Sequence, residues 1–222
     1  MTRIATLLEV RAGKVREHAR PDWDRHANRL WKSAYVKDPL AGEARVTPLG
    51  IEGDEQYSRD VHGGEHMALL AYSAAHYADW REALSLPAMG PGGFGENLVL
   101  DGADETEVCI GDVWSAGGVR LQVSQPRGPC ANISRRWNRE DLVQRVTANG
   151  RTGWYLRVLA PGAIAAGQGI DLVERPHARW TVARVFRARV EPKTPRETLA
   201  AIAGLAALSP EWRAKFSARL AG

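Results

Sequence analysis

Hydrophobic and polar positions alternate along most of the chain, in short runs separated by Gly, Pro, Asn and Asp. This spacing is typical of half-buried strands. It predicts strands at 4–10, 43–51, 67–72, 98–100, 108–110, 113–115, 119–123, 154–159 and 170–173. Residues 4–10 and Val15 are expected to pair around a turn at Gly13. Many short strands punctuated by turns indicate a β-barrel rather than alternating strand–helix units.

Two segments within this body show helical spacing instead. Residues 73–84 predict an amphipathic helix with Ser73 as its cap. Residues 138–149 predict a second helix, with Asn138 as its cap and Gly150 at its end. Two helices do not change the fold class, so the body is expected to be mainly β.

The composition changes after Pro176. A capping box that begins at Thr194 predicts a helix at 195–208, and a Ser-Pro pair at Ser209 predicts another at 210–220. Residues 181–190 alternate like a strand but fit a third helix equally well. We therefore expect a small helical appendage, joined to the body at 174–180.

Composition narrows the class of protein. The 222 residues are 44% hydrophobic and 25% charged, which suits one large domain with or without an appendage. The formal net charge of +4 fits an anionic ligand, and no block of like charges marks a nucleic-acid tail. Two cysteines in a chain too large to need a disulfide indicate a reducing cytoplasm. Because no signal-peptide pattern or long apolar run is present, we expect a soluble protein.

The segment 124–130, Ser-Gln-Pro-Arg-Gly-Pro-Cys, carries the most distinctive chemistry. Its prolines and glycine are expected to stop the preceding strand and to form a stiff turn. The turn presents Cys130, with Arg127 three residues earlier. A nearby guanidinium stabilises a thiolate, which can be a nucleophile or a soft-metal ligand. The alternative is a cysteine packed as a small hydrophobe, which is also our expectation for Cys109.

Two earlier segments combine acids or histidines with glycine. Residues 50–55 hold three carboxylates, but their spacing does not match a calcium loop, so we expect a solvated turn. His62 and His66 would share a face if they lay on a helix, and that face could hold zinc. Since the two residues after His62 are glycines, a helix is disfavoured. A bound anion beside His62 is the better interpretation.

Glu96 and Asn97 follow a long loop rich in glycine and directly precede a strand. A carboxylate beside an amide suits the donors and acceptors on the edge of a heterocycle. Alternatively, the two side chains bond their own backbone in a turn. The spacing alone favours the turn.

Taken in order, these motifs resemble the MOSC family, whose members are related to the C-terminal part of molybdenum cofactor sulfurase. The resemblance runs from about residue 4 to residue 173 and rests on Ser33-Ala34 with Lys37, Gly50-Ile51-Glu52-Gly53-Asp54, His62-Gly63-Gly64, Phe94-Gly95-Glu96-Asn97-Leu98 and the segment 124–130. The tail is similar to the three-helix extension of the YiiM-like bacterial branch, which favours a helix at 181–190. The implied fold is a MOSC-type β-barrel with a few helices at 1–175 (motif core about 33–173) and a three-helix extension at 180–222.

The resemblance also implies a cofactor. It implies that the barrel binds the molybdenum cofactor (Mo-molybdopterin), with Cys130 as the catalytic residue and the protein ligand to molybdenum. The pterin phosphate needs cationic or backbone donors, for which Lys37, His62 and Arg127 are the candidates. The remaining cofactor-binding residues implied by motif position are Ser33, Glu96, Asn97, Ser124 and Asn132.

By the same resemblance, the reaction is the reduction of N-hydroxylated compounds such as 6-N-hydroxylaminopurine to amines, a detoxification. Because the chain has no Rossmann or flavin motif, electrons are expected from a separate flavin-type reductase. Neither a membrane nor polymeric nucleic acid is an expected partner, and a homodimer remains open. One alternative is a cofactor or sulfur carrier that uses a Cys130 persulfide and reduces nothing. The other is a metal hydrolase built on His62, His66 and Asp54.

Overall fold

A seven-stranded barrel forms the body of the computed structural model, which describes residues 1–58 and 62–222. Going round the barrel, the strands are β1 (Thr2–Ala12), β13 (Gly169–Glu174), β9 (Val113–Ala116), β10 (Val119–Pro126), β11 (Trp154–Ala160), β7 (Leu69–Ser73) and β8 (Leu98–Asp101). Pairing of β1 with both β13 and β8 closes the ring. Neighbouring strands are antiparallel except β7 and β8, which are parallel.

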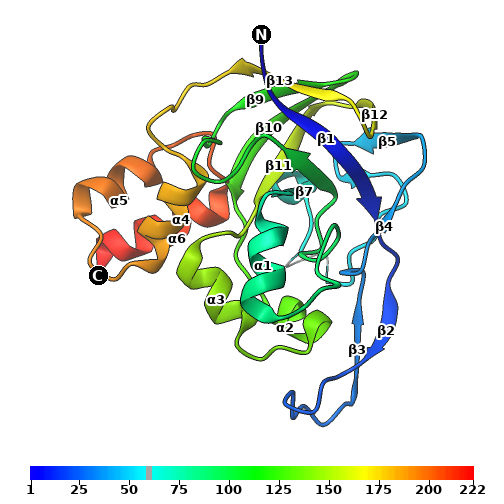
Figure 1. Cartoon of the computed structure of the whole chain (residues 1–222). Coiled ribbons are helices and arrows are strands. Elements are labelled where there is room, and N and C mark those ends of the chain that lie inside the picture. Colours follow the sequence, from blue (N-terminus) through cyan, green and yellow to red (C-terminus); the bar gives the residue numbers. More distant parts are fainter. Residues whose placement is uncertain (59–61) are drawn as a thin grey trace.

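Shorter strands extend the barrel. β4 (Asp38–Pro39) pairs antiparallel with the end of β1, and a small sheet consists of β12 (Gly162–Ala165), β5 (Glu43–Thr47) and β6 (Gly50–Ile51). β2 (Arg16–Ala19) and β3 (Leu30–Ser33) form a separate hairpin that extends away from the barrel at the lower right of Figure 1.

The helices lie in two groups outside the barrel (Figure 1). The first group is α1 (His76–Leu84), α2 (Ala131–Trp137) and α3 (Leu142–Asn149), whereas the short 3-10 helix η1 (Glu65–Met67) lies against β10 and β11. The second group, on the opposite side from the hairpin, is α4 (Val182–Val190), α5 (Arg196–Ala203) and α6 (Pro210–Ala221). Within the described residues, every helix is too short or too polar to cross a bilayer.

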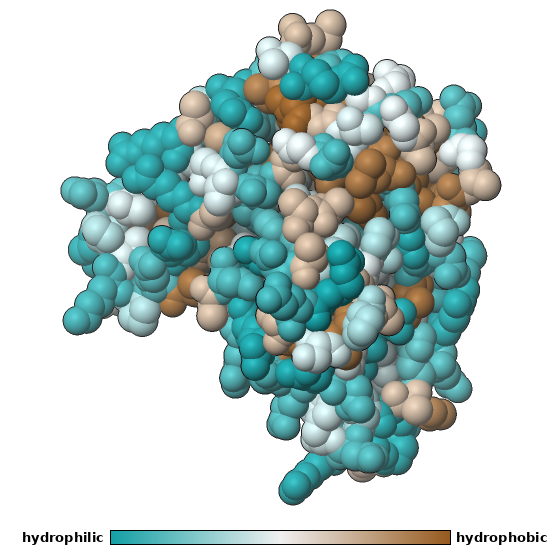
Figure 2. Space-filling view, in the orientation of Figure 1, coloured by the Kyte–Doolittle hydropathy of each residue, from teal (hydrophilic) through white to brown (hydrophobic). Residues whose placement is uncertain are grey.

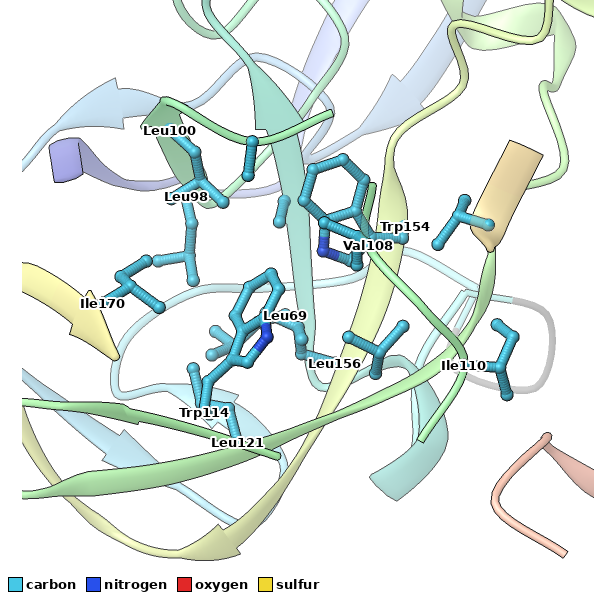
Figure 3. Packing of buried hydrophobic residues seen from close by; sticks show 14 of the residues in the cluster. Leu69, Leu98, Leu100, Val108, Ile110, Trp114, Leu121, Trp154, Leu156 and Ile170 are labelled. Atoms are coloured by element: carbon cyan, nitrogen blue, oxygen red, sulfur yellow. The ribbon is translucent and has the colours of Figure 1, made fainter. Parts of the chain in front are cut away.

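Tryptophan and aliphatic side chains fill the barrel. Trp114 of β9 and Trp154 of β11 meet edge to face, with ring centroids 6.1 Å apart (Figure 3). Buried residues of α4–α6, such as Val185 and Phe216, belong to the same hydrophobic cluster. The three-helix segment is thus packed on the barrel through a continuous core, as burial of its apolar faces requires.

A second cluster lies under α1, α2 and α3. Tyr72 stacks on Phe94 with centroids 4.2 Å apart, and Trp80 packs beside Phe94. The Trp80 indole donates a hydrogen bond to the Tyr72 hydroxyl at 2.7 Å, so the polar atoms of these two buried aromatic side chains are hydrogen-bonded to each other. It fixes the loop that precedes β8, which is one wall of the cavity described below.

The predicted barrel is confirmed, and so are most of its strands and the C-terminal helices. Residues 181–190 contain α4, and Ser209 caps α6 by accepting a hydrogen bond from Trp212 N at 3.3 Å. The expected capping box at Thr194 is wrong. The Thr194 hydroxyl donates to the carbonyls of Ala188 and Glu191, and α5 begins after Pro195 without a side-chain cap.

Three further local predictions are wrong. Ser73 is the last residue of β7, and α1 begins only at His76. Asn138 does not start a helix. It adopts a left-handed conformation (φ 50°) at the end of α2, as asparagine can at a C-terminus, and α3 follows as a separate helix. Residues 4–10 pair across the barrel with distant strands rather than with Val15.

The remaining corrections concern the two cysteine-containing segments. Residues 108–110 form no strand, and Cys109 makes an isolated bridge to Thr181 instead. The predicted turn starts later than Ser124, because β10 continues to Pro126, which still pairs with Trp154. The segment that leaves the barrel is thus only four residues long and ends at Cys130.

Candidate functional site

A cavity of about 480 Å³ opens beside the barrel, between the β2–β3 hairpin and the start of α2. Its walls come mainly from the hairpin and the residues after it, the turn that follows β6, the loop before β8, and the segment 127–132. Residues around η1 and β7, and Tyr155 of β11, complete the lining. It contains Cys130 and six of the eight predicted cofactor-binding residues, namely Ser33, Lys37, His62, Asn97, Arg127 and Asn132.

Cys130 is half-buried in the cavity wall, directly before α2. The Arg127 N–H donates to the Gly153 carbonyl at 3.0 Å, which extends the pairing of β10 and β11 by one bond. After that bond the chain turns out of the barrel and delivers the thiol. The rigid strand pair therefore sets the position of Cys130, with only a short segment between them.

The Arg127 guanidinium is a buried cation. Its side chain is 3% exposed, and Nη2 lies 3.4 Å from the Tyr35 hydroxyl. Nη1 is buried without a hydrogen-bond partner. Among the residues that the structure describes, none places a carboxylate oxygen within 4.0 Å of it. A buried charge left in this state is costly, so Arg127 is a cation that lacks an anion.

Arg127 and its two tyrosine neighbours keep their protons at neutral pH. Burial raises the pKa of Tyr35 and of Tyr155, and the nearby guanidinium only partly opposes this. Burial by itself would lower the pKa of Arg127, but Tyr35, Cys130 and Tyr155 outweigh it and the pKa is raised. The cavity therefore presents a fixed positive charge beside two phenolic O–H groups.

A second buried cation, Lys37, is fully paired. Its ammonium donates to both carboxylate oxygens of Asp54, at 2.5 and 2.6 Å. Asp54 also accepts from Gly13 N at 2.7 Å and from Asn97 Nδ2 at 2.9 Å, while Asn97 Oδ1 accepts from Leu70 N at 3.1 Å. Burial lowers the pKa of Lys37, and Asp54 opposes that shift. This network forms the floor of the cavity and ties β7, β8 and the turn after β6 together.

The hairpin closes the cavity through contacts with α2. Asp24, in the hairpin loop, accepts from Arg20 at 2.6 Å and from Arg135 of α2 at 2.7 Å. Because of the Arg135 hydrogen bond and then that of Arg20, the pKa of Asp24 is lowered to about 2. Asn132 of α2 also reaches the hairpin, with its Nδ2 at 3.5 Å from Ser33 Oγ.

Two predicted cofactor-binding residues do not line the cavity. The fully buried Glu96 carboxylate accepts from the Tyr77 hydroxyl and from the backbone N–H groups of Gly92 and Phe94, so it holds the loop before β8 from behind. The Ser124 hydroxyl donates to the carbonyls of His66 (2.6 Å) and Tyr155 (3.0 Å). Both residues support cavity walls, so any contribution they make to cofactor binding is through the residues that they hold in place.

Neither the burial of Asp54 against Lys37 nor the place of Tyr35 and Tyr155 beside Arg127 was predicted from the sequence. Asp54 was expected in a solvated turn, yet its side chain is 2% exposed. The alternating acid and glycine pattern at 50–55 gives no hint of the lysine that neutralises it. Tyr35 and Tyr155 carry no motif of their own. Tyr35 lies between Ser33 and Lys37, and this position within a motif was the one feature of the sequence that could have indicated a place in the site.

The histidines do not form a metal centre. His62 lines the cavity, and its pKa is lowered by burial and then by Arg127. His66 lies outside the cavity, with its pKa lowered by burial. Within residues 1–58 and 62–222, no three His, Cys, Asp or Glu side chains converge as metal ligands would. The hydrolase hypothesis, which required His62, His66 and Asp54 to converge, is therefore wrong.

Comparison with known proteins places these features in a family. Residues 58–171 match the family model described as MOSC domain, and residues 180–222 match the one described as YiiM-like, 3-alpha helix domain. The uncharacterized protein YflK of Bacillus subtilis is 35% identical over 185 residues, which is 83% of this chain and 83% of that protein.

Two further similarities concern a named enzyme and a solved structure. A protein of Gibberella moniliformis named Reductase is 38% identical over 189 residues, or 82% of this chain, but the match spans only 32% of that longer protein. The crystal structure of YiiM from Geobacillus stearothermophilus superposes with a TM-score of 0.81 at 30% identity, covering 97% of this chain and 99% of that one.

Proposed function

The chain belongs to the MOSC domain family and carries the YiiM-like three-helix domain, and on this premise we propose that it is a molybdenum-dependent reductase of N-hydroxylated compounds. The reaction would be R–NHOH + 2e⁻ + 2H⁺ → R–NH₂ + H₂O, in which the N–O bond breaks and water leaves. The similarity to a protein named Reductase supports an oxidoreductase role.

The observation that carries the proposal is the pairing of Cys130 with Arg127 in one cavity. A half-buried thiol in the same cavity as a fixed positive charge is a soft donor of the kind that molybdenum takes as a ligand. The buried guanidinium, with Nη1 unpartnered, suits an anionic group such as the phosphate of the molybdenum cofactor. The donor set therefore fits that cofactor, with Cys130 as ligand to molybdenum and Arg127 at the phosphate.

When bound, the cofactor would supply the two-electron chemistry at its metal. The chain's own residues would bind the cofactor and orient the substrate. The protonated hydroxyls of Tyr35 and Tyr155 are hydrogen-bond donors available to the oxygen that leaves as water. Asn97 is fixed by three hydrogen bonds, so it keeps the floor rigid rather than offering a free amide to the pterin. Lys37 is likewise committed to Asp54, so Arg127 is the stronger candidate at the phosphate.

Metal analysis with a turnover assay tests the proposal. Protein is prepared from a host that makes the molybdenum cofactor, and reduction of 6-N-hydroxylaminopurine is driven by dithionite-reduced methyl viologen. We expect about one molybdenum per chain and turnover in the wild type, and loss of both in Cys130→Ser. Cys109→Ser is the matched control, since that thiol is 2% exposed and away from the cavity. It should keep both.

The same experiment separates the second candidate, a cofactor or sulfur carrier that uses a Cys130 persulfide. Molybdenum that depends on Cys130, without reduction of any hydroxylamine, favours the carrier. Folded wild type that holds no molybdenum contradicts the reductase. Because no flavin or nicotinamide motif is present in the sequence, the purified holoprotein should not use a nicotinamide directly. Turnover with a nicotinamide alone would contradict the need for a separate flavin-type reductase.

A further inference from the structure

Positive charge gathers at the mouth of the cavity. Residues 14–33, which contain the β2–β3 hairpin, hold six Lys and Arg against three Asp and Glu. Residues 131–139, which contain α2, hold three Arg and no acid. These two segments, which we call the basic rim, carry a formal charge of +6 by themselves, or +3 when the three acids that pair with them from outside, Asp38, Glu55 and Asp141, are counted.

The two halves of the basic rim form one surface. Asp24 bridges Arg20 of the hairpin and Arg135 of α2, and the Trp23 indole donates to Asn138 at 3.1 Å. Residues of both halves line the cavity. Arg25 and Arg136, next in sequence to Asp24 and Arg135, are exposed. In Figure 2 the lower end of the molecule, where Figure 1 shows β2 and β3, is coloured mostly hydrophilic.

Two large apolar side chains of the cavity wall are exposed, and one of them belongs to the rim. Leu30 of β3 is 44% exposed and Tyr57, which lies outside the two rim segments, is 59% exposed. Apolar contacts surrounded by charged residues are the usual anatomy of a protein–protein interface.

We propose that the basic rim is the docking surface for an acidic flavoprotein, which delivers electrons at the cavity. This inference rests on the proposed function, because the reduction needs two electrons and two protons that a reduced flavin (hydroquinone) can supply while it is oxidised to the quinone. Opposite charges steer such partners together and fix their orientation. The rim surrounds the cavity that contains Cys130, so a partner seated there brings its flavin to the site where electrons are used.

The chain has a second basic region, which supplies the control. Residues 175–222 hold ten Lys and Arg against three Asp and Glu, but none of them lines the cavity. The rim variant is Arg25→Glu/Arg136→Glu, and the control is Arg184→Glu/Lys193→Glu. Each variant combines two exposed cations. One, Arg25 or Lys193, makes no ion pair with any residue that the structure describes, and the other stacks on a tryptophan, Arg136 on Trp137 and Arg184 on Trp180. The change in net charge is the same in both.

The test compares two electron donors on the holoprotein. Methyl viologen is small and cationic, so turnover of 6-N-hydroxylaminopurine with it reports the chemistry alone. A photoreduced flavodoxin serves as the acidic flavoprotein probe. We expect the rim variant to raise the KM for flavodoxin about tenfold at low ionic strength, with the difference shrinking in 0.5 M salt, roughly as screening predicts. Its viologen-driven rate and melting temperature should match wild type, and the control variant should behave as wild type with both donors.

Each other outcome overturns a specific claim. If flavodoxin-driven turnover is unchanged in the rim variant, or falls equally in both variants, the rim is not the docking surface. If only the control variant loses flavodoxin-driven turnover, the partner docks on the three-helix segment. If wild type shows no viologen-driven turnover, the proposed function itself fails, which is a different result from failure of docking.

Discussion

The buried ion pair under the cavity should be the most sensitive point of the fold. Replacement of Asp54 by alanine leaves the Lys37 ammonium, which is 8% exposed, without its carboxylate. It also removes the acceptor for Gly13 N and Asn97 Nδ2. Removal of one partner of a buried pair costs about 3–5 kcal/mol, and the two lost hydrogen bonds add roughly 0.5–1.5 kcal/mol each. We expect the free energy of unfolding to fall by at least about 4 kcal/mol at pH 7.

The loss of stability caused by Asp54→Ala should become smaller as the pH rises. Burial already lowers the pKa of Lys37, and without Asp54 only the charge of Glu96 opposes that shift. The unfolded chain then holds the lysine proton more tightly than the folded variant does, so the variant's stability rises with pH. The deficit of Asp54→Ala relative to wild type should therefore be smaller at pH 9 than at pH 7.

Urea denaturation of the cofactor-free protein, followed by circular dichroism, measures both effects. Lys37→Met is the matched comparison and should cost less, because the Asp54 carboxylate keeps two donors, Gly13 N and Asn97 Nδ2. The double variant Lys37→Met/Asp54→Asn should cost less than the sum of the single changes, since no charge is left unpaired. A loss below about 1 kcal/mol in Asp54→Ala, against the range expected for a buried pair, would refute the reasoning.

Two further predictions concern the cavity wall. Gly95 (φ +75°) and Gly53 (φ +87°) share a left-handed backbone, but a Cβ at Gly95 would lie 2.8 Å from the Tyr35 ring, whereas one at Gly53 meets nothing within 4 Å. Gly95→Ala should therefore lower the melting temperature more than Gly53→Ala, and equal losses would argue against the contact. Because burial lowers the pKa of His62, its contribution to stability is present above pH 6.5, the usual histidine value, and is lost as pH falls. His62→Gln should flatten the loss of stability between pH 7 and 5, the exposed His26→Gln should not, and identical slopes would contradict this.

The fold could be predicted from the sequence because its signals are local. Alternation over 119–123 and 154–159 marks β10 and β11, and Ser209 before a proline marks α6. Where one residue type serves two purposes, the sequence was ambiguous. Asparagine caps a helix start through its side chain but ends one through its backbone, and Asn138 does the second. For this reason α2 ends where a helix was predicted to begin, and α3 begins later than predicted.

The site was harder to predict because its decisive contacts join distant residues. Cys130 and Arg127 lie in one motif, so their proximity is fixed by a short turn. The Asp54 carboxylate finds its lysine 17 residues earlier, and Arg127 meets Tyr35 across 92 residues. No local pattern encodes those pairings. Glu96 shows the opposite case, because the spacing alone favoured a turn in which it bonds its own backbone. Its carboxylate does accept from the nearby N–H groups of Gly92 and Phe94, and only its third partner, the Tyr77 hydroxyl, lies farther away in the sequence.

Substitutions of the two buried cations of the cavity should have opposite effects on the stability of the cofactor-free protein. This contrast tests whether Arg127 holds the phosphate of the cofactor. Lys37 is neutralised within the protein, whereas the tyrosines around Arg127 are protonated at neutral pH and offer it no charge. An unpaired buried charge is destabilising until an anion arrives. Arg127→Met should therefore leave the cofactor-free protein as stable as wild type or more so, while molybdenum is no longer retained. Lys37→Met should lower the melting temperature of the cofactor-free protein. If Arg127→Met unfolds at lower temperature and still binds molybdenum, Arg127 stabilises the fold and the anion lies elsewhere.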